Sequence, residues 1–208
     1  MKKELIIFDM DGTLVDSSLT IAYAINYVRE KINLAPLDPH HIVEKVNDHT
    51  LNPAQYFYEV ETFTKEHEVW FSEYYTHNHK RELVLYDGIK ELLHSLKEND
   101  CKLAVATNAY RGSTIESLTH LGVYNLFDTI ACHDDVPQGK PYPDMLYKVL
   151  NELSITASKS LFIGDGSRDE MAAKRANIEY IMVNWGFSEY TNALGSVDAL
   201  HRTLHKRI

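Results

Sequence analysis

The stretch Leu5-Ile6-Ile7-Phe8-Asp9-Met10-Asp11-Gly12-Thr13-Leu14-Val15-Asp16 joins a short apolar run to an acidic turn. The apolar run at residues 5–8 is typical of a strand that is buried on both faces, as the strands of parallel sheets are. In open parallel sheets, ligands bind beyond the carboxyl ends of the strands. The stretch therefore predicts a parallel sheet with a ligand site at Asp9 and Asp11.

The spacing of this acidic pair indicates what the site binds. Asp9 and Asp11 are two residues apart, so both side chains can face one site while the chain is still extended. Two carboxylates at close range repel each other, so they bind a divalent cation or share a proton. Oxygen ligands of this kind suit Mg²⁺. A bare pair of acids more often only ends a strand and caps a turn, but the downstream motifs favour a metal site.

A regular alternation of helical and strand-like segments follows Asp87-Gly88. Strands that alternate with helices indicate an α/β fold with a doubly wound parallel sheet. The pattern predicts helices at 89–98, 113–120, 143–153, 169–176 and 196–204, and strands at 102–106, 129–132, 161–163 and 180–183.

The segment between the first strand and this alternation is helical throughout. Apolar residues recur at helical spacing after Ser17 or Ser18, either of which can cap the first helix. Asp38-Pro39 and Asn52-Pro53 each combine an N-cap residue with proline at the first helical position. We therefore expect residues 17–82 to form an inserted α-helical domain and residues 1–16 with 83–208 to form the core domain.

The composition is that of an ordinary globular protein. Of 208 residues, 44% are hydrophobic and 25% are charged. No apolar run approaches the roughly 18 residues that a membrane helix needs. The formal net charge of −9 disfavours binding to nucleic acid or acidic membranes. With only Cys101 and Cys132 present, we expect no disulfide framework and a cytoplasmic protein. From the charge and the apolar pattern, we expect neither nucleic-acid nor membrane partners.

Further candidate site residues follow the later strands. Thr107-Asn108 offers a hydroxyl and a backbone N–H to a phosphoryl oxygen, although such a pair is usually only a turn. Lys140 lies in the proline-stiffened loop before a helix, where it can neutralise a phosphate; most lone lysines are surface charges. Asp165 ends a strand as a metal ligand would, whereas Asp169 can also be a simple N-cap.

The ordered motifs D-x-D-G-T-L-x-D, Thr-Asn, Lys-Pro-x-Pro and G-D-x-x-x-D resemble those of the haloacid dehalogenase-like (HAD) hydrolase superfamily. The chain is most similar to its phosphoglycolate phosphatase-like branch, in which a helical cap is inserted after the first motif. The resemblance implies a Rossmann-like core. It also implies a magnesium-dependent phosphatase that hydrolyses a small phosphomonoester through an aspartyl-phosphate intermediate.

The same resemblance assigns roles to the acidic residues. Asp9 corresponds to the nucleophile, and Asp11 to the general acid that later activates water. Mg²⁺ would be held by Asp9, Asp165 and the backbone carbonyl of Asp11, with Asp169 in support.

The remaining motif residues would bind the substrate. Thr107 and the backbone at Asn108 would hold phosphoryl oxygens, and Lys140 would balance the charge of Asp9 and phosphate. Ala109 stands where many relatives have lysine, and Gly166 where many have serine or threonine.

Asn177 stands where the family often ends a helix with glycine, and asparagine tolerates the left-handed conformation required there. Neither this departure nor those at Ala109 and Gly166 changes the residues expected to perform the chemistry.

Several functions other than phosphomonoester hydrolysis use similar motifs. Within the superfamily, the alternatives are a pyrophosphatase, a nucleotidase and a β-phosphoglucomutase-like mutase. A haloacid dehalogenase is less favoured, because its chemistry does not need the acid that Asp11 supplies. A phospho-accepting receiver module lacks a large helical insertion and carries its phosphoacceptor on a middle strand. The partner expected is a small phosphorylated metabolite, and the sequence leaves open both its identity and the choice between monomer and homodimer.

Overall fold

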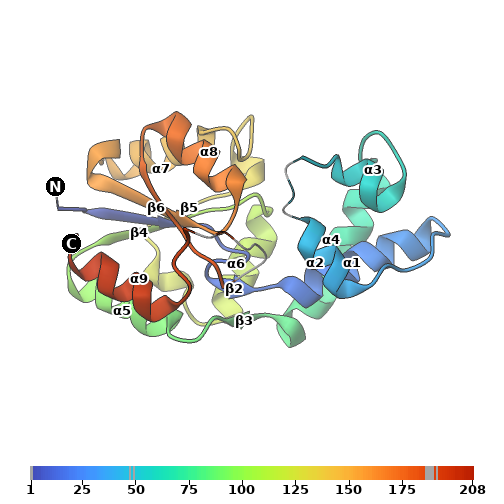
Figure 1. The fold of residues 1–208 in the computed structure, drawn as a ribbon, viewed down its shortest axis with the longest axis horizontal. Coiled ribbons are helices and arrows are strands. Elements are labelled where there is room, and N and C mark those ends of the chain that lie inside the picture. Colours follow the sequence, from blue (N-terminus) through green and yellow to red (C-terminus); the bar gives the residue numbers. More distant parts are fainter. Residues whose placement is uncertain (1, 47, 49, 186–189, 191) are drawn as a thin grey trace. The chain divides into compact units, whose positions relative to one another are not determined.

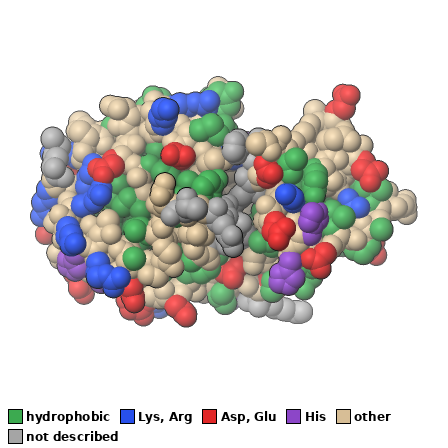
Figure 2. All heavy atoms as spheres, viewed as in Figure 1, with side chains coloured by type: hydrophobic (Ala, Val, Ile, Leu, Met, Phe, Trp, Pro, Cys, Tyr) green, Lys and Arg blue, Asp and Glu red, His purple; other side chains and the backbone are tan. Residues whose placement is uncertain are grey.

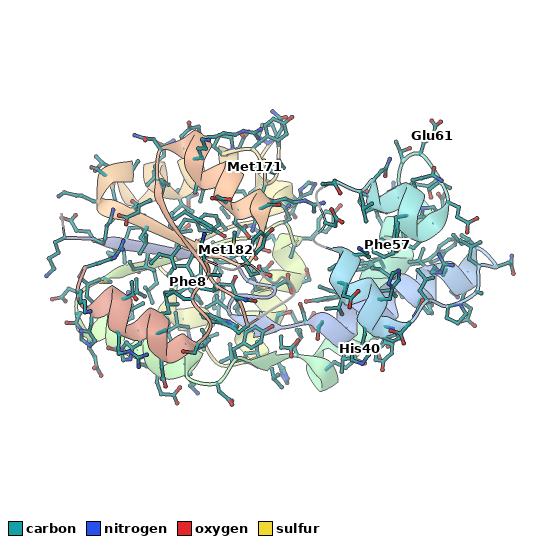
Figure 3. All side chains as sticks on the ribbon, in the orientation of Figure 1. Phe8, His40, Phe57, Glu61, Met171 and Met182 are labelled. Atoms are coloured by element: carbon teal, nitrogen blue, oxygen red, sulfur yellow. The ribbon has the colours of Figure 1, made fainter. Side chains whose placement is uncertain are left out.

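The computed structural model describes residues 2–46, 48, 50–185, 190 and 192–208. The chain forms two compact units. The core unit comprises Met1–Asp16 and Val84–Ile208, and the helical unit comprises Ser17–Leu83. Each unit has its own apolar interior, with Phe8 inside the core unit and Phe57 inside the helical unit (Figure 3).

A five-stranded parallel sheet forms the centre of the core unit. Its strand order is β5-β4-β1-β6-β7, which places β1 in the middle. Phe8, the last residue of β1, pairs with Val105 on one side and Ile163 on the other. The segments that follow these three strands therefore meet at one edge of the sheet. The strands are β1 (Leu5–Phe8), β4 (Lys102–Ala106), β5 (Thr129–Ala131), β6 (Ser160–Gly164) and β7 (Glu179–Met182).

Helices cover both faces of this sheet, with α7 and α8 on one side and α5 and α9 on the other (Figure 1). Alternate residues of β1 serve the two faces: Leu5 and Ile7 belong to the cluster that includes α7 and α8. This arrangement confirms the predicted doubly wound α/β fold. The helices are α5 (Ile89–Glu98), α6 (Arg111–His120), α7 (Asp144–Leu153), α8 (Ser167–Ala176) and α9 (Val197–His205).

Most predicted elements are confirmed within two residues, and the helix at 89–98 and the strand at 102–106 have the predicted bounds. Two helices begin two residues earlier than expected. In α6, the N–H of Arg111 donates to Asp134 Oδ1 at 2.8 Å, a distant partner that local sequence does not reveal. In α8, Asp169 is the third helical residue and not the N-cap, which is Gly166.

A short antiparallel ribbon was not predicted. It joins β2 (Val15–Asp16) to β3 (Val84–Leu85), with Val15 opposite Leu85. Strands of two residues have no periodicity to detect, and these two are separated by the whole helical unit. The ribbon brings together the two ends of the core unit between which the helical unit is inserted.

The helical unit consists of α1 (Ser18–Lys31), α2 (Pro39–Val46), α3 (Pro53–Tyr58) and α4 (Lys65–Glu82). Both predicted asparagine and aspartate caps are confirmed: Asn52 Oδ1 accepts from Ala54 N at 3.0 Å, and Asp38 Oδ1 accepts from His41 N at 3.1 Å. Ser17 precedes α1, but its side chain makes no capping hydrogen bond.

The helical unit also buries one guanidinium. Arg29 lies in α1, and its side chain donates to the carbonyl oxygens of Ala35 and Phe57, so the buried charge is hydrogen-bonded.

Across the described ranges, the chain contains no helix with both the length and the apolar character needed to cross a membrane.

Substitution of Asn177 tests the importance of the backbone conformation at the end of α8. Its φ of 54° lies in the left-handed region, as the sequence predicted. We expect Asn177→Ala to lower the free energy of unfolding by about 1 kcal/mol, because alanine lacks the short polar side chain that lets asparagine adopt the left-handed conformation. Asn177→Gly should keep or raise it, because glycine has no β-carbon. Urea denaturation measures both. Asn151→Ala, within α7, should be neutral or stabilising; equal losses at both positions would contradict the explanation.

Candidate functional site

Three buried carboxylates meet at the carboxyl edge of the sheet. Asp9 follows β1, Asp165 follows β6, and Asp169 lies in the first turn of α8. One carboxylate oxygen of each lies within 4.8 Å of the others. Charged groups are seldom buried without a partner, so this cluster requires positive charge.

Lys140 supplies part of that charge. Its Nζ lies 2.5 Å from Asp9 Oδ1 and 2.6 Å from Asp169 Oδ1, and the residue is only 7% exposed. The ammonium also lies 5.7 Å from the centre of the Phe162 ring. The structure thus brings together a lysine and an aspartate that are 131 residues apart in the chain.

The electrostatics of the cluster favour a further cation. Burial raises the pKa of Asp9, the negative charges of Asp169 and Asp165 raise it further, and Lys140 offsets part of the rise. Burial alone lowers the pKa of Lys140, but the charges of Asp169 and Asp9 outweigh burial and raise it, so the ammonium persists. The fully ionised form of the three carboxylates with one ammonium carries two net negative charges, which a bound Mg²⁺ would balance.

Hydrogen bonds hold Asp165 and Asp169 in place. Gly166 N donates to Asp169 Oδ2 at 3.1 Å, and Thr13 Oγ1 makes a weak hydrogen bond to Asp165 Oδ1 at 3.5 Å. The hydroxyl of Tyr180 donates to the carbonyl of Gly166 at 3.3 Å. The backbone between the two aspartates is therefore supported from β7 as well as from α8.

The predicted phosphate-binding residues follow β4. Thr107 is buried, and its Oγ1 accepts from Ala109 N at 3.1 Å, which leaves the hydroxyl proton to donate. Asn108 makes contacts that the sequence did not predict: its side chain forms two hydrogen bonds with the backbone of Lys140, at 2.8 and 3.0 Å. The β4 end and the lysine loop are thus directly connected.

Asp11 lies in the turn after β1 but outside the three-carboxylate cluster. The turn is closed by Gly12, which has a φ of 80° and donates to Val15 O at 2.9 Å. Asp11 is half-buried, and its charge contributes, after burial and the charges of Asp16 and Asp165, to raising the pKa of Tyr86. Its carboxylate is therefore placed at the same edge without joining the buried cluster.

Sequence reasoning missed three residues that shape the site. Thr13 contacts Asp165, and its carbonyl accepts from Trp185 Nε1 at 3.1 Å. Gly164 leaves room for Asp169, because a β-carbon built there would lie 2.6 Å from Asp169 Cγ. Gly139 leaves similar room beside the lysine loop. Gly164 opens the G-D-x-x-x-D motif and Gly139 directly precedes Lys140, but the sequence does not reveal which side chains need the space that they leave.

A pocket lined mainly by basic residues lies at the opposite edge of the sheet from the acidic cluster. Lysine and arginine side chains gather at the end of the core unit that carries both termini (Figures 1 and 2), around this pocket of about 450 Å³. Its buried Lys3 donates to the carbonyl oxygens of Ser158 and Ser160 and pairs with Glu179 at 3.0 Å. These contacts explain Lys3 structurally, so the candidate site is the acidic cluster.

Comparison with known proteins relates most of the chain to one family of hydrolases. A model of the family described as haloacid dehalogenase-like hydrolase matches residues 6–183, a range that includes every predicted site residue. The chain is 34% identical over 196 residues to the phosphoglycolate phosphatase of Colwellia psychrerythraea, covering 90% of this chain and 87% of that protein. It is 27% identical over 192 residues to pyrophosphatase PpaX of Halalkalibacterium halodurans, covering 89% and 85%.

The chain is also similar to a solved structure. The crystal structure of a predicted phosphoglycolate phosphatase from Haemophilus somnus matches with a TM-score of 0.78 at 28% identity. The match covers 90% of this chain and 88% of that chain.

Gly164→Ala tests the space that Asp169 requires. The added methyl group would lie 2.6 Å from Asp169 Cγ and 2.7 Å from its Cβ, so the aspartate must shift. We expect a loss of about 1–3 kcal/mol in the free energy of unfolding, measured in urea, together with weaker Mg²⁺ binding by calorimetry. In Gly112→Ala, nothing lies within 4 Å of the added carbon, so both quantities should stay unchanged or improve slightly. Equal behaviour of the two variants would contradict this account.

Proposed function

The chain belongs to the haloacid dehalogenase-like hydrolase family, and from this premise we propose that it is a magnesium-dependent phosphatase for a small phosphomonoester. Relatives named phosphoglycolate phosphatase and pyrophosphatase support phosphatase activity at this coarser level. The observation that carries the finer proposal is the buried contact of Asp9 with Lys140 beside Asp165 and Asp169.

The charge arrangement suits attack by a carboxylate on phosphorus. A carboxylate and a phosphate dianion repel each other, so the reaction needs fixed positive charge between them. Lys140 lies against the Asp9 carboxylate and can neutralise both groups. Mg²⁺ held by Asp9, Asp165 and the backbone carbonyl of Asp11 would supply further positive charge to the transferring phosphoryl group.

We assign the two chemical steps to Asp9 and Asp11. A carboxylate oxygen of Asp9 bonds to phosphorus as the bond to the leaving oxygen breaks, and Asp11 donates a proton to that oxygen. Asp11 then takes a proton from water as the water oxygen bonds to phosphorus. The bond between Asp9 and phosphorus breaks, which releases phosphate and restores both side chains. Thr107 and the backbone N–H of Asn108 hold the phosphoryl oxygens throughout.

The helical unit has a separate role in this proposal. We propose that Ser17–Leu83 acts as a cap that excludes bulk water and selects the leaving group. The residues that perform the chemistry all belong to the core unit, so the cap determines the substrate without supplying the nucleophile.

Substrate class and metal dependence can be tested together. With Mg²⁺, the purified protein should release phosphate from p-nitrophenyl phosphate and from at least one member of a panel that includes phosphoglycolate, pyrophosphate, nucleotides and sugar phosphates. Chelation should lower the rate by at least about 10²-fold, because a main source of charge stabilisation is removed, and added Mg²⁺ should restore it. Activity on a 2-haloacid alone would overturn the proposal.

The roles of the two aspartates predict different defects. Asp9→Asn should lower kcat by at least about 10³-fold without phosphorylating the protein, since the nucleophile is lost. Asp11→Asn should also be slow but should accumulate phosphorylated protein, detectable by mass spectrometry after rapid acid quench. Asp198→Asn, at an exposed position of α9, serves as the control and should retain activity. Near-normal turnover in either active-site variant would contradict the assignment.

A further inference from the structure

We propose that the side chain of Asn108 is a positioning residue, which holds the backbone of Lys140 so that the lysine ammonium lies between Asp9 and Asp169. The inference rests on the proposed function, in which Lys140 neutralises the nucleophile and the phosphate. It concerns the amide side chain of Asn108 and is separate from the backbone N–H of that residue, which the mechanism uses for the phosphoryl group.

The geometry of the contact carries the proposal. Asn108 Oδ1 accepts from Lys140 N at 2.8 Å, and Asn108 Nδ2 donates to Lys140 O at 3.0 Å. One amide thereby engages both backbone polar groups of a single residue that is 32 positions away. Two bonds to one residue fix the orientation of its backbone as well as its distance, which one bond would not.

Lys140 needs such support because its own side chain is flexible. A lysine side chain has four rotatable bonds, and holding it in one geometry costs conformational entropy. Its ammonium nevertheless contacts two carboxylates, at 2.5 and 2.6 Å. Fixing the backbone of Lys140 reduces the number of side-chain conformations in which the ammonium does not contact these two carboxylates.

Gly139 provides the room for this contact. A β-carbon built on Gly139 would lie 2.6 Å from Asn108 Oδ1 and 2.7 Å from His133 Nδ1. The Asn108 side chain therefore occupies space that any other residue at position 139 would fill. The amide is closely packed in its place between β4 and the lysine loop.

A double-mutant cycle on p-nitrophenyl phosphate hydrolysis tests the proposal. Asn108→Ala keeps the backbone N–H and should lower kcat about 10- to 100-fold, as misplacement of a catalytic group by about 1 Å does, with little change in KM. In a Lys140→Ala background, the same substitution should change kcat less than about threefold, because the group that it positions is already absent.

Asn26 gives a matched control. Its side chain makes the same pair of bonds with the backbone of Leu37, both at 2.8 Å, within the helical unit. Asn26→Ala removes equivalent hydrogen bonds, but its effect on kcat, whatever its size, should be the same with and without Lys140. The comparison separates positioning of the lysine from a general loss of stability.

Each outcome decides between the alternatives. Equal losses from Asn108→Ala in both backgrounds, no loss at all, or a rise in KM with unchanged kcat would overturn the inference while leaving the proposed function intact. No effect of Lys140→Ala itself would instead refute the role of lysine in the proposed function. If Asn108→Ala does not fold, Asn108→Ser keeps a short polar side chain without adding a charge, and its loss should likewise disappear in the Lys140→Ala background.

Discussion

The core unit is organised around a buried excess of negative charge. Asp9, Asp165 and Asp169 lie within one small volume, and Lys140 contacts two of them. Such a group is unfavourable in a protein interior unless every member has a partner. The sheet topology, the lysine loop and the space left by particular glycines can all be understood as means of supplying those partners.

The sheet topology makes the charge cluster possible. Because β1 pairs with both β4 and β6, the residues after the three strands emerge side by side. A central parallel strand needs no side chain of its own to bring its neighbours' ends together, since backbone hydrogen bonds set the register. Strand pairing thus places Asp9, Thr107 and Asp165 at one edge of the sheet, and the first turn of α8 adds Asp169.

The sequence predicted the parts of this arrangement that depend on local pattern. Apolar runs and helical periodicity predicted the strands and helices of the core unit, and acidic or hydroxyl residues at the strand ends predicted the candidate site. The two-residue ribbon at Val15–Asp16 and Val84–Leu85 was missed, because it depends on a pairing across an entire inserted unit. The amide bridge from Asn108 was missed for a different reason: its partner is the backbone of Lys140, and backbone groups carry no sequence signal.

The two glycines beside the site are needed for close packing, which the sequence motifs alone do not show. Neither Gly139 nor Gly164 has a positive φ, so conformational freedom does not explain them. Each instead leaves room for a polar side chain from elsewhere, Asn108 in one case and Asp169 in the other. Asp169 and Lys140 contact each other, so both glycines support the same ion pair from opposite ends. Close packing around that pair restricts the ammonium, and in the proposed mechanism this keeps a positive charge beside Asp9 in a fixed direction.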